Sequence, residues 1–155
     1  MHSTAATISY GICASKVAVS GASVVNGVGG ESTATTTDNG SYGMYVGTDL
    51  TVSDSSSVTA AADKGYNSYG LYIHYNASET NSGNITVSGT ATVTGDGGEA
   101  ANESFGVYAS SSSGTVTVSG TASLTGNGGV AKNSYGVYSG GAGISAKDSA
   151  RLTGT

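Results

Sequence analysis

Apolar and polar residues alternate in short segments that recur along this chain. One set of segments covers residues 17–20, 50–53, 85–88, 116–119 and 144–147, and a second set covers residues 22–25, 56–59, 91–94, 122–125 and 150–153. A period of two is that of a β-strand with one buried face. The pattern therefore predicts two short strands, each repeated five times.

A third recurrent segment precedes each of these pairs. It has the form serine, aromatic residue, glycine, aliphatic residue, tyrosine, and its serines are Ser9, Ser41, Ser68, Ser104 and Ser134. The first copy departs from this form because Cys13 stands where the others have tyrosine. The serines are 32, 27, 36 and 30 residues apart, which is the period of a repeat architecture.

Three strands in a repeat of about 30 residues predict an all-β fold, the single-stranded parallel β-helix or solenoid. We expect about five coils of 27–36 residues, starting near residues 9, 41, 68, 104 and 134. Residues 1–155 form one domain in this interpretation, and it is a fragment of a longer array, since both ends stop within a repeat. The 26 glycines and the missing 3.6-residue apolar period oppose helices.

Stacked coils place equivalent residues in ladders about 4.8 Å apart. The predicted inner ladders are Val17/Leu50/Ile85/Val116/Ile144, Val19/Val52/Val87/Val118/Ala146 and Val24/Val58/Val93/Leu124/Leu152. The first aromatic residue of each phrase tolerates phenylalanine at Phe105, which suits an inner or corner site beside the aliphatic residue two positions later. The last residue then faces outward, giving the row Cys13, Tyr45, Tyr72, Tyr108 and Tyr138.

The composition restricts the classes of partner that this chain is expected to bind. Only 10% of the residues are charged, the net charge is −5, and the five lysines and arginines are spread singly, so we expect no nucleic-acid partner. No apolar run approaches the ~18 residues of a membrane span, so membrane insertion is not expected either. Cys13 cannot form an internal disulfide and fills a ladder position. Neither terminus supplies a cap, so the end coils are expected to fray or to pair with another molecule.

The phrases Ser-Tyr-Gly-Val-Tyr, Thr-Val-Ser-Gly-Thr-Ala and Leu-Thr-Gly-Asn-Gly-Gly carry a resemblance. They resemble the degenerate right-handed β-helix repeats of large secreted or wall-anchored bacterial surface proteins, with the pectin-lyase-like superfamily as the fold relative. The resemblance covers nearly the whole chain. It implies an extracellular or cell-surface location, on a scaffold that carries adhesins, tailspikes, polysaccharide lyases and stalks.

Enzymes on that scaffold cluster acidic residues on the coil exterior, and this chain offers no such cluster. Its ten acids lie almost entirely in turns, with no Asp-Asp or Asp-x-Asp. A vertical column joining Asp54 and Asp148 is broken by Gly89 and Gly120. The turn at residues 94–99 has the wrong spacing for a calcium loop, and His2 and His74 lack a second ligand at metal spacing. We therefore expect no catalytic residues, no metal and no cofactor.

Two features are candidate ligand-binding elements: the outward row Tyr45, Tyr72, Tyr108 and Tyr138, and the long loop Ile73 to Asn84 with His74 and Tyr75. Outward rings either stack against sugars or stack on one another and stiffen the sheet, and both alternatives stay open. The expected function is a non-enzymatic structural or adhesive segment of a bacterial surface protein. The alternatives are a carbohydrate-binding module and, third, a remnant of a polysaccharide-processing enzyme.

Overall fold

The computed structural model describes residues 7–33, 35–36, 40–74, 83–110, 114–141 and 143–155, and these residues form fifteen β-strands and no helix. The strands lie in three sheets of five parallel strands. The first sheet contains β1 (Ser9–Ala14), β4 (Gly40–Val46), β7 (Gly65–Ile73), β10 (Ala100–Ala109) and β13 (Asn133–Ser139). The second contains β2 (Val17–Val19), β5 (Leu50–Val52), β8 (Ile85–Val87), β11 (Thr115–Val118) and β14 (Gly143–Ala146). The third contains β3 (Val24–Val28), β6 (Ser57–Ala61), β9 (Thr92–Asp96), β12 (Ser123–Asn127) and β15 (Arg151–Gly154).

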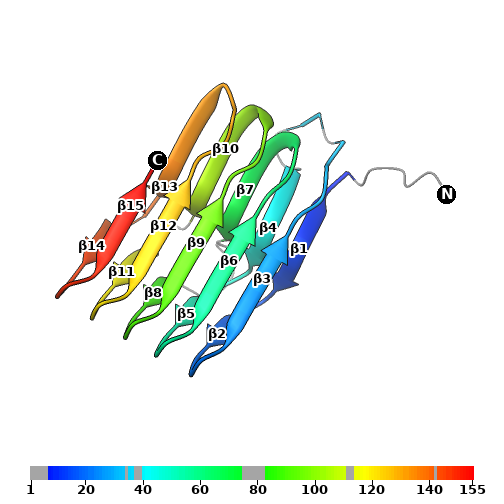
Figure 1. Ribbon diagram of the computed structural model, residues 1–155. Helices are drawn as coiled ribbons and strands as arrows, with labels where there is room; N and C mark the ends of the chain where they lie inside the picture. Colours follow the sequence, from blue (N-terminus) through cyan, green and yellow to red (C-terminus); the bar gives the residue numbers. More distant parts are fainter. Residues whose placement is uncertain (1–6, 34, 37–39, 75–82, 111–113, 142) are drawn as a thin grey trace.

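Each coil takes one strand from each sheet, so the chain is a β-solenoid with three strands per coil, as the repeats predict. Coil 1 comprises β1–β3 and coil 5 comprises β13–β15, and these two coils lie at opposite ends of the stack (Figure 1). Strands that pair come from successive repeats, which places equivalent residues of neighbouring coils side by side. The repeated phrases are in register, with Ser41 opposite Ser68 and Ser104 opposite Ser134.

The first two inner ladders are confirmed. Val17, Leu50, Ile85, Val116 and Ile144 are successive partners in the second sheet, and so are Val19, Val52, Val87, Val118 and Ala146. Their members in coils 2–4 are fully buried. Burying each such side chain is worth roughly 1.5–3 kcal/mol, so the middle coils supply most of the apolar stabilisation.

The third ladder was predicted wrongly in coil 1. Val25, not Val24, pairs with Val58, and Val24 pairs with Ser57 and is exposed. Alignment of the repeats by their apolar pattern places Ala22 opposite Ser56. In the structure, the backbone N–H of Ser57 donates to the carbonyl of Ser23, so it is Ser23 that lies opposite Ser56. Ser23 and Ser56 also make the same turn, each donating its hydroxyl to the carbonyl three residues earlier. The adjacent valines made both registers compatible with the apolar pattern.

The glycine in each phrase marks a corner where the first and third sheets meet. A Cβ atom on Gly106 would lie 2.3 Å from the backbone nitrogen of Asn127 and 2.6 Å from the carbonyl carbon of Gly126. In the pairing of β10 with β13, Phe105 and Val107 are paired residues and Gly106 between them is not. The strand therefore bends at glycine, and strict alternation stops there.

This bend corrects the predicted placement of the first aromatic residue. Tyr42, Tyr69 and Phe105 are buried, as expected, but they belong to an aromatic cluster separate from the aliphatic core that contains Met44, Leu71 and Val107. Their neighbours in that cluster are the last aromatic residues of the phrases, Tyr45, Tyr72 and Tyr108. Both aromatic positions thus lie on the same outer side of the first sheet.

In coils 1–4 the serine that opens the phrase has a structural role that the sequence pattern did not suggest. The fully buried Ser104 donates its hydroxyl to the carbonyl of Gly98 at 2.9 Å and accepts the backbone N–H of Gly129 at 2.9 Å. In the same way, Ser68 donates its hydroxyl to the carbonyl of Asp63 at 2.7 Å, and the hydroxyl also lies 3.1 Å from the carbonyl oxygen of Glu99. These hydroxyls tie the first sheet to the turns that precede it.

Replacing Ser104 by alanine is expected to lower the free energy of unfolding by about 1–3 kcal/mol, because the carbonyl of Gly98 and the N–H of Gly129, both in half-buried turns, lose the partner that the buried Ser104 hydroxyl provides. Chemical denaturation measures the change. The matched control is Ser134→Ala, which alters the same ladder position in coil 5, where the serine is exposed. A loss for Ser104→Ala no larger than for Ser134→Ala would contradict the assigned role.

Candidate functional site

The aromatic residues of the phrases form two adjoining rows on the outer side of the first sheet. Row A is Tyr10, Tyr42, Tyr69, Phe105 and Tyr135, and row B is Cys13, Tyr45, Tyr72, Tyr108 and Tyr138. Neighbouring ring centroids are 4.8–5.2 Å apart in row A and 5.2–5.3 Å apart in row B. The two rows touch edge to face, with centroids 4.6–5.8 Å apart and ring planes at 61–84°.

The outward rings were expected either to stack against sugars or to stack on one another. In row B the rings stack on one another. The faces of the inner rings are covered by the rings of the coils before and after, at interplanar angles of 6–15° in row B. Sugar rings bind to aromatic faces, so the middle of the row offers ring edges and hydroxyl groups rather than a flat platform. Only the terminal rings, among them Tyr10 and Tyr138, stack on one side alone.

The loop residue His74 joins this surface. Its ring stacks on those of Tyr45 and Tyr72, with centroids 5.7 and 6.0 Å apart, and its Nδ1 lies 3.5 Å from the Tyr72 hydroxyl. Tyr75, the other loop residue proposed for the site, lies outside the described residues. A hollow of about 440 Å³ follows rows A and B from Tyr10 to Tyr108, with His74 at its side.

Burial changes the acid–base behaviour of these tyrosines. Loss of water raises the pKa of Tyr45 to about 12, with a smaller contribution from the neighbouring Tyr72. The same cause raises the pKa of Tyr42 and of Tyr69 well above the ordinary value. The phenols of Tyr42, Tyr45 and Tyr69, which are neutral at physiological pH as any tyrosine is, therefore stay neutral to a higher pH than an exposed tyrosine would.

We expect stability to be lost as the pH rises above 10. The pKa of Tyr45 is about 10 in the unfolded chain and about 12 in the folded protein, so between these values only the unfolded state ionises and unfolding becomes more favourable. Below pH 10 both states are protonated and this contribution is constant. Phenolate absorbance and far-UV circular dichroism, followed together, should show buried tyrosines ionising only as the sheets unfold. Ionisation of all tyrosines near pH 10 with the sheet signal intact would contradict this.

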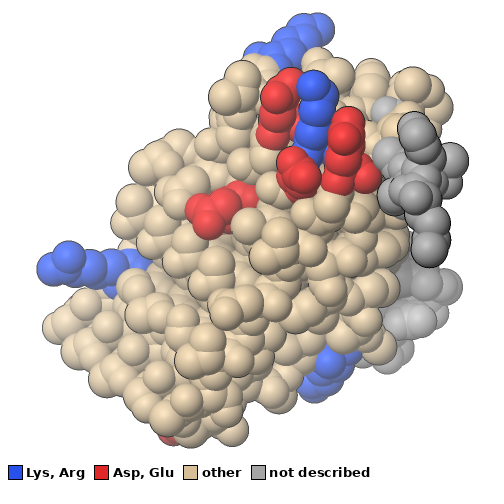
Figure 2. Space-filling model, turned by 45° about the vertical axis from the view of Figure 1, so that its right-hand side comes forward, with Lys and Arg blue, Asp and Glu red and all other residues tan. Residues whose placement is uncertain are grey.

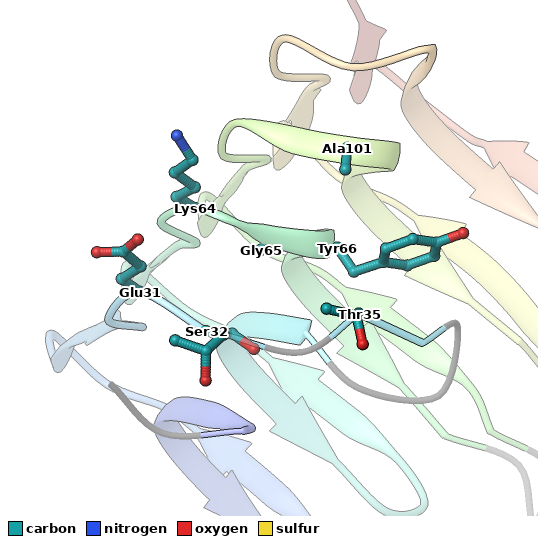
Figure 3. Close-up of a pocket in the computed structure, with 8 residues that line it drawn as sticks. Glu31, Ser32, Thr35, Lys64, Gly65, Tyr66 and Ala101 are labelled. Carbon is teal, nitrogen blue, oxygen red and sulfur yellow. The ribbon is translucent and has the colours of Figure 1, made fainter. Parts of the chain in front are cut away.

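A second hollow, of about 470 Å³, lies at the corner between the third and first sheets and was not anticipated from the sequence. Figure 3 shows Tyr66 and Ala101 on one side of it, Thr35 below the tyrosine, and Lys64 and Glu31 at the outer rim. Lys64 forms an ion pair with Glu99 at 3.0 Å, and this contact together with Glu31 raises the pKa of the lysine. Figure 2 shows several acidic side chains gathered around one basic side chain on the face that it presents. In the sequence, the charged rim of this hollow corresponds to a charged residue that follows the third strand in successive coils: Glu31, Lys64 and Glu99.

Several acids of the described chain hold neighbouring coils together. The Asp54 carboxylate accepts the N–H of Gly21 at 2.8 Å, and that of Asp148 accepts the N–H of Gly120 at 3.1 Å. Asp49 accepts the N–H of Asn84, and Asp96 accepts a side-chain N–H of Asn127. Each bond joins one coil to the next, so these carboxylates act along the solenoid axis.

The predicted break in the Asp54–Asp148 column is also present in the structure. Gly89 and Gly120 occupy the same turn in the two intervening coils, and all four residues have a φ between 61° and 73°. Asp38 and Glu79 lie outside the described residues. Within the described ranges, no group of three or more histidine, cysteine, aspartate or glutamate side chains is placed to hold a metal ion.

Comparisons with known proteins gave no match to a family model, to a curated protein or to a solved structure. The class of protein therefore comes from the fold alone: a parallel β-solenoid with three strands per coil and two outward aromatic rows. In the part of the chain that the structure describes, no helix has the length and apolarity needed to cross a membrane.

Proposed function

We propose that this chain is a non-enzymatic structural or adhesive segment of an extracellular bacterial surface protein. The observation that supports it most is the stacking along rows A and B, in which each inner ring stacks on the rings of the coils before and after it. The carboxylates that accept hydrogen bonds from a neighbouring coil also hold the coils together along the solenoid axis. Aromatic and acidic side chains, which could have bound a ligand or catalysed a reaction, here join neighbouring coils and stiffen the solenoid, as a stalk requires.

The extracellular bacterial setting rests on the repeat phrases and on their resemblance to β-helical repeats of surface proteins. A low charge, a glycine- and serine-rich composition and short strands are compatible with that setting.

Incubation with pectin, alginate and host glycans, followed by measurement of new reducing ends, tests the non-enzymatic part. We expect no depolymerisation above a heat-inactivated control. Reproducible depolymerisation would overturn the proposal and favour the third candidate, a polysaccharide-processing enzyme remnant.

The second candidate function is carbohydrate binding at the aromatic rows. The hollow between Tyr10 and Tyr108 supports it, because its walls present phenol hydroxyls and the His74 ring. Since the ring faces are covered, a glycan would bind there through hydroxyls and ring edges.

A glycan array with the wild-type chain and with the double variant Tyr45→Phe/Tyr72→Phe separates the two functions. Phenylalanine keeps the stacking, as Phe105 does in row A, and removes only the hydroxyls. Binding that the double variant loses at unchanged stability supports the carbohydrate-binding candidate. Absence of binding to every glycan by the wild type favours the stalk.

A further inference from the structure

Tyr66, the second residue of β7, differs from the other aromatic residues that the structure describes. Every other described tyrosine, and Phe105, stacks on at least one ring of row A or row B. Tyr66 is half-buried and contacts no ring of the described residues. Its ring therefore has room for a further aromatic group, of the kind that the rings of the two rows find in one another.

The strand pairing explains why Tyr66 has no ring partner in the following coil. The pairing of β7 with β10 is irregular between Ala100 and Glu103, where β10 has two residues opposite Tyr66 alone. Such a β-bulge interrupts the ladder that stacks the rings of rows A and B. Ala101 brings only a methyl group to this place, and the hollow of about 470 Å³ lies beside the tyrosine (Figure 3).

The hollow is lined by segments of three successive coils. Glu31 and Thr35, between β3 and β4, lie on one side of it, Gly65 and Tyr66 of β7 follow, and Ala101 of β10 lies on the other side. The tyrosine ring, the alanine methyl group and the threonine side chain make its walls largely apolar. A volume of 470 Å³ is within the range of small-molecule pockets, roughly 300–1,000 Å³.

The rim of the hollow is acidic. The carboxylate of Glu99 lies 3.0 Å from the Lys64 ammonium and is the largest cause of the raised pKa of this lysine. Glu31 and Asp63 raise the same pKa further, so all three acids lie near the lysine. Three carboxylates against one ammonium give a net charge of −2. Since Lys64 pairs with Glu99, the charges of Glu31 and Asp63 attract a further cation.

We propose that this hollow binds a small aromatic amine, with its ring stacked on Tyr66 and its ammonium group at the acidic rim. The ligand ring takes the position that a neighbouring ring takes in row A, where centroids are 4.8–5.2 Å apart. The acidic rim favours a cation over an anionic ligand of the same shape. The site is separate from rows A and B, so it is independent of the stalk and of glycan binding.

Titration of the nitrogen-15-labelled protein with phenethylamine, followed through the backbone amide chemical shifts, tests the proposal. We expect saturable shifts centred on Gly65 and Ala101. Phenethyl alcohol keeps the ring without the charge, and butylamine keeps the charge without the ring, so each should bind more weakly than phenethylamine. Phenylacetate, which carries the opposite charge, should produce no saturable shifts at these two residues.

Three substitutions separate the contributions to binding. Tyr66→Leu keeps an apolar side chain but removes the ring, and should weaken phenethylamine binding by about 2–13-fold, whereas the matched control Tyr66→Phe should bind like the wild type. Glu31→Gln should weaken binding by about 1.5–5-fold at low salt and less at high salt, because a charge pair at an exposed rim is screened. Ala101→Leu fills the hollow and should abolish the shifts.

Circular dichroism checks that the sheets persist in each variant. Ala101 is exposed, so its substitution tests the site without altering the core. Absence of saturable shifts at Gly65 and Ala101 in the wild type would overturn the proposal. So would phenethylamine affinity that Ala101→Leu leaves unchanged, or equal affinities for phenethylamine and phenethyl alcohol. Shifts centred on Tyr45 and Tyr72 would also overturn it, because they would place the amine at the aromatic rows.

Discussion

Gly106→Ala is expected to lower the free energy of unfolding by about 3 kcal/mol or more, the upper range for overpacking a buried site. The added Cβ would meet the backbone of β12 at 2.3–2.7 Å. Backbone atoms cannot move aside as a flexible side chain can, so the first and third sheets would have to separate at this corner. Chemical denaturation of the purified variant measures the effect.

Gly140→Ala is the matched control. The nearest atom to its added Cβ is the carbonyl oxygen of Ser110 at 3.4 Å, an ordinary contact. Backbone bonds place Gly47, His74, Ser110 and Gly140 at the same position of successive coils, so side chains are accepted there. We expect a change within about 0.5 kcal/mol. Equal losses for Gly106→Ala and Gly140→Ala would show that the corner does not require glycine.

Leu124→Ala is expected to lower the free energy of unfolding by about 2–5 kcal/mol, the usual range for a buried leucine. Leu124 is fully buried between its ladder partners Val93 and Leu152. The substitution removes apolar contacts and leaves a cavity that coils on both sides hold open. Thermal and chemical denaturation both measure the loss.

Leu152→Ala makes the same chemical change one coil further along the same ladder. Because Leu152 is 36% exposed and has a neighbour on one side only, we expect a loss below about 1.5 kcal/mol. A loss for Leu152→Ala as large as that for Leu124→Ala would contradict the distinction between middle and end coils.

The sequence predicted the architecture because the fold repeats itself. Each ladder position is sampled five times, so the alternation around Val52, Val87 and Val118 identifies an inner face without other information. The prediction failed where one coil alone carried the signal. In coil 1 the pair Val24 and Val25 satisfies two registers, and only the turn made by Ser23 distinguishes them.

The aromatic site was predicted in part, for a different reason. Row B was placed outward correctly, but row A was expected at an inner or corner site, because Phe105 shows that the position does not need a hydroxyl. The bend at Gly43 and its equivalents moves Tyr42 to the outer side, and that bend follows from backbone contacts between sheets that the sequence does not display. The hollow beside Tyr66 also depends on segments far apart in the chain.

The central claim is that successive repeats stack as parallel coils in register, and a distance along one ladder tests it most directly. Ala18, Thr51, Thr86, Thr117 and Ser145 form one outward ladder of the second sheet. Spin labels on cysteines at positions 18 and 145, in a Cys13→Ser background, should be about 19 Å apart, four strand spacings, with a narrow distribution. A broad distribution centred beyond about 30 Å would contradict the stacked solenoid.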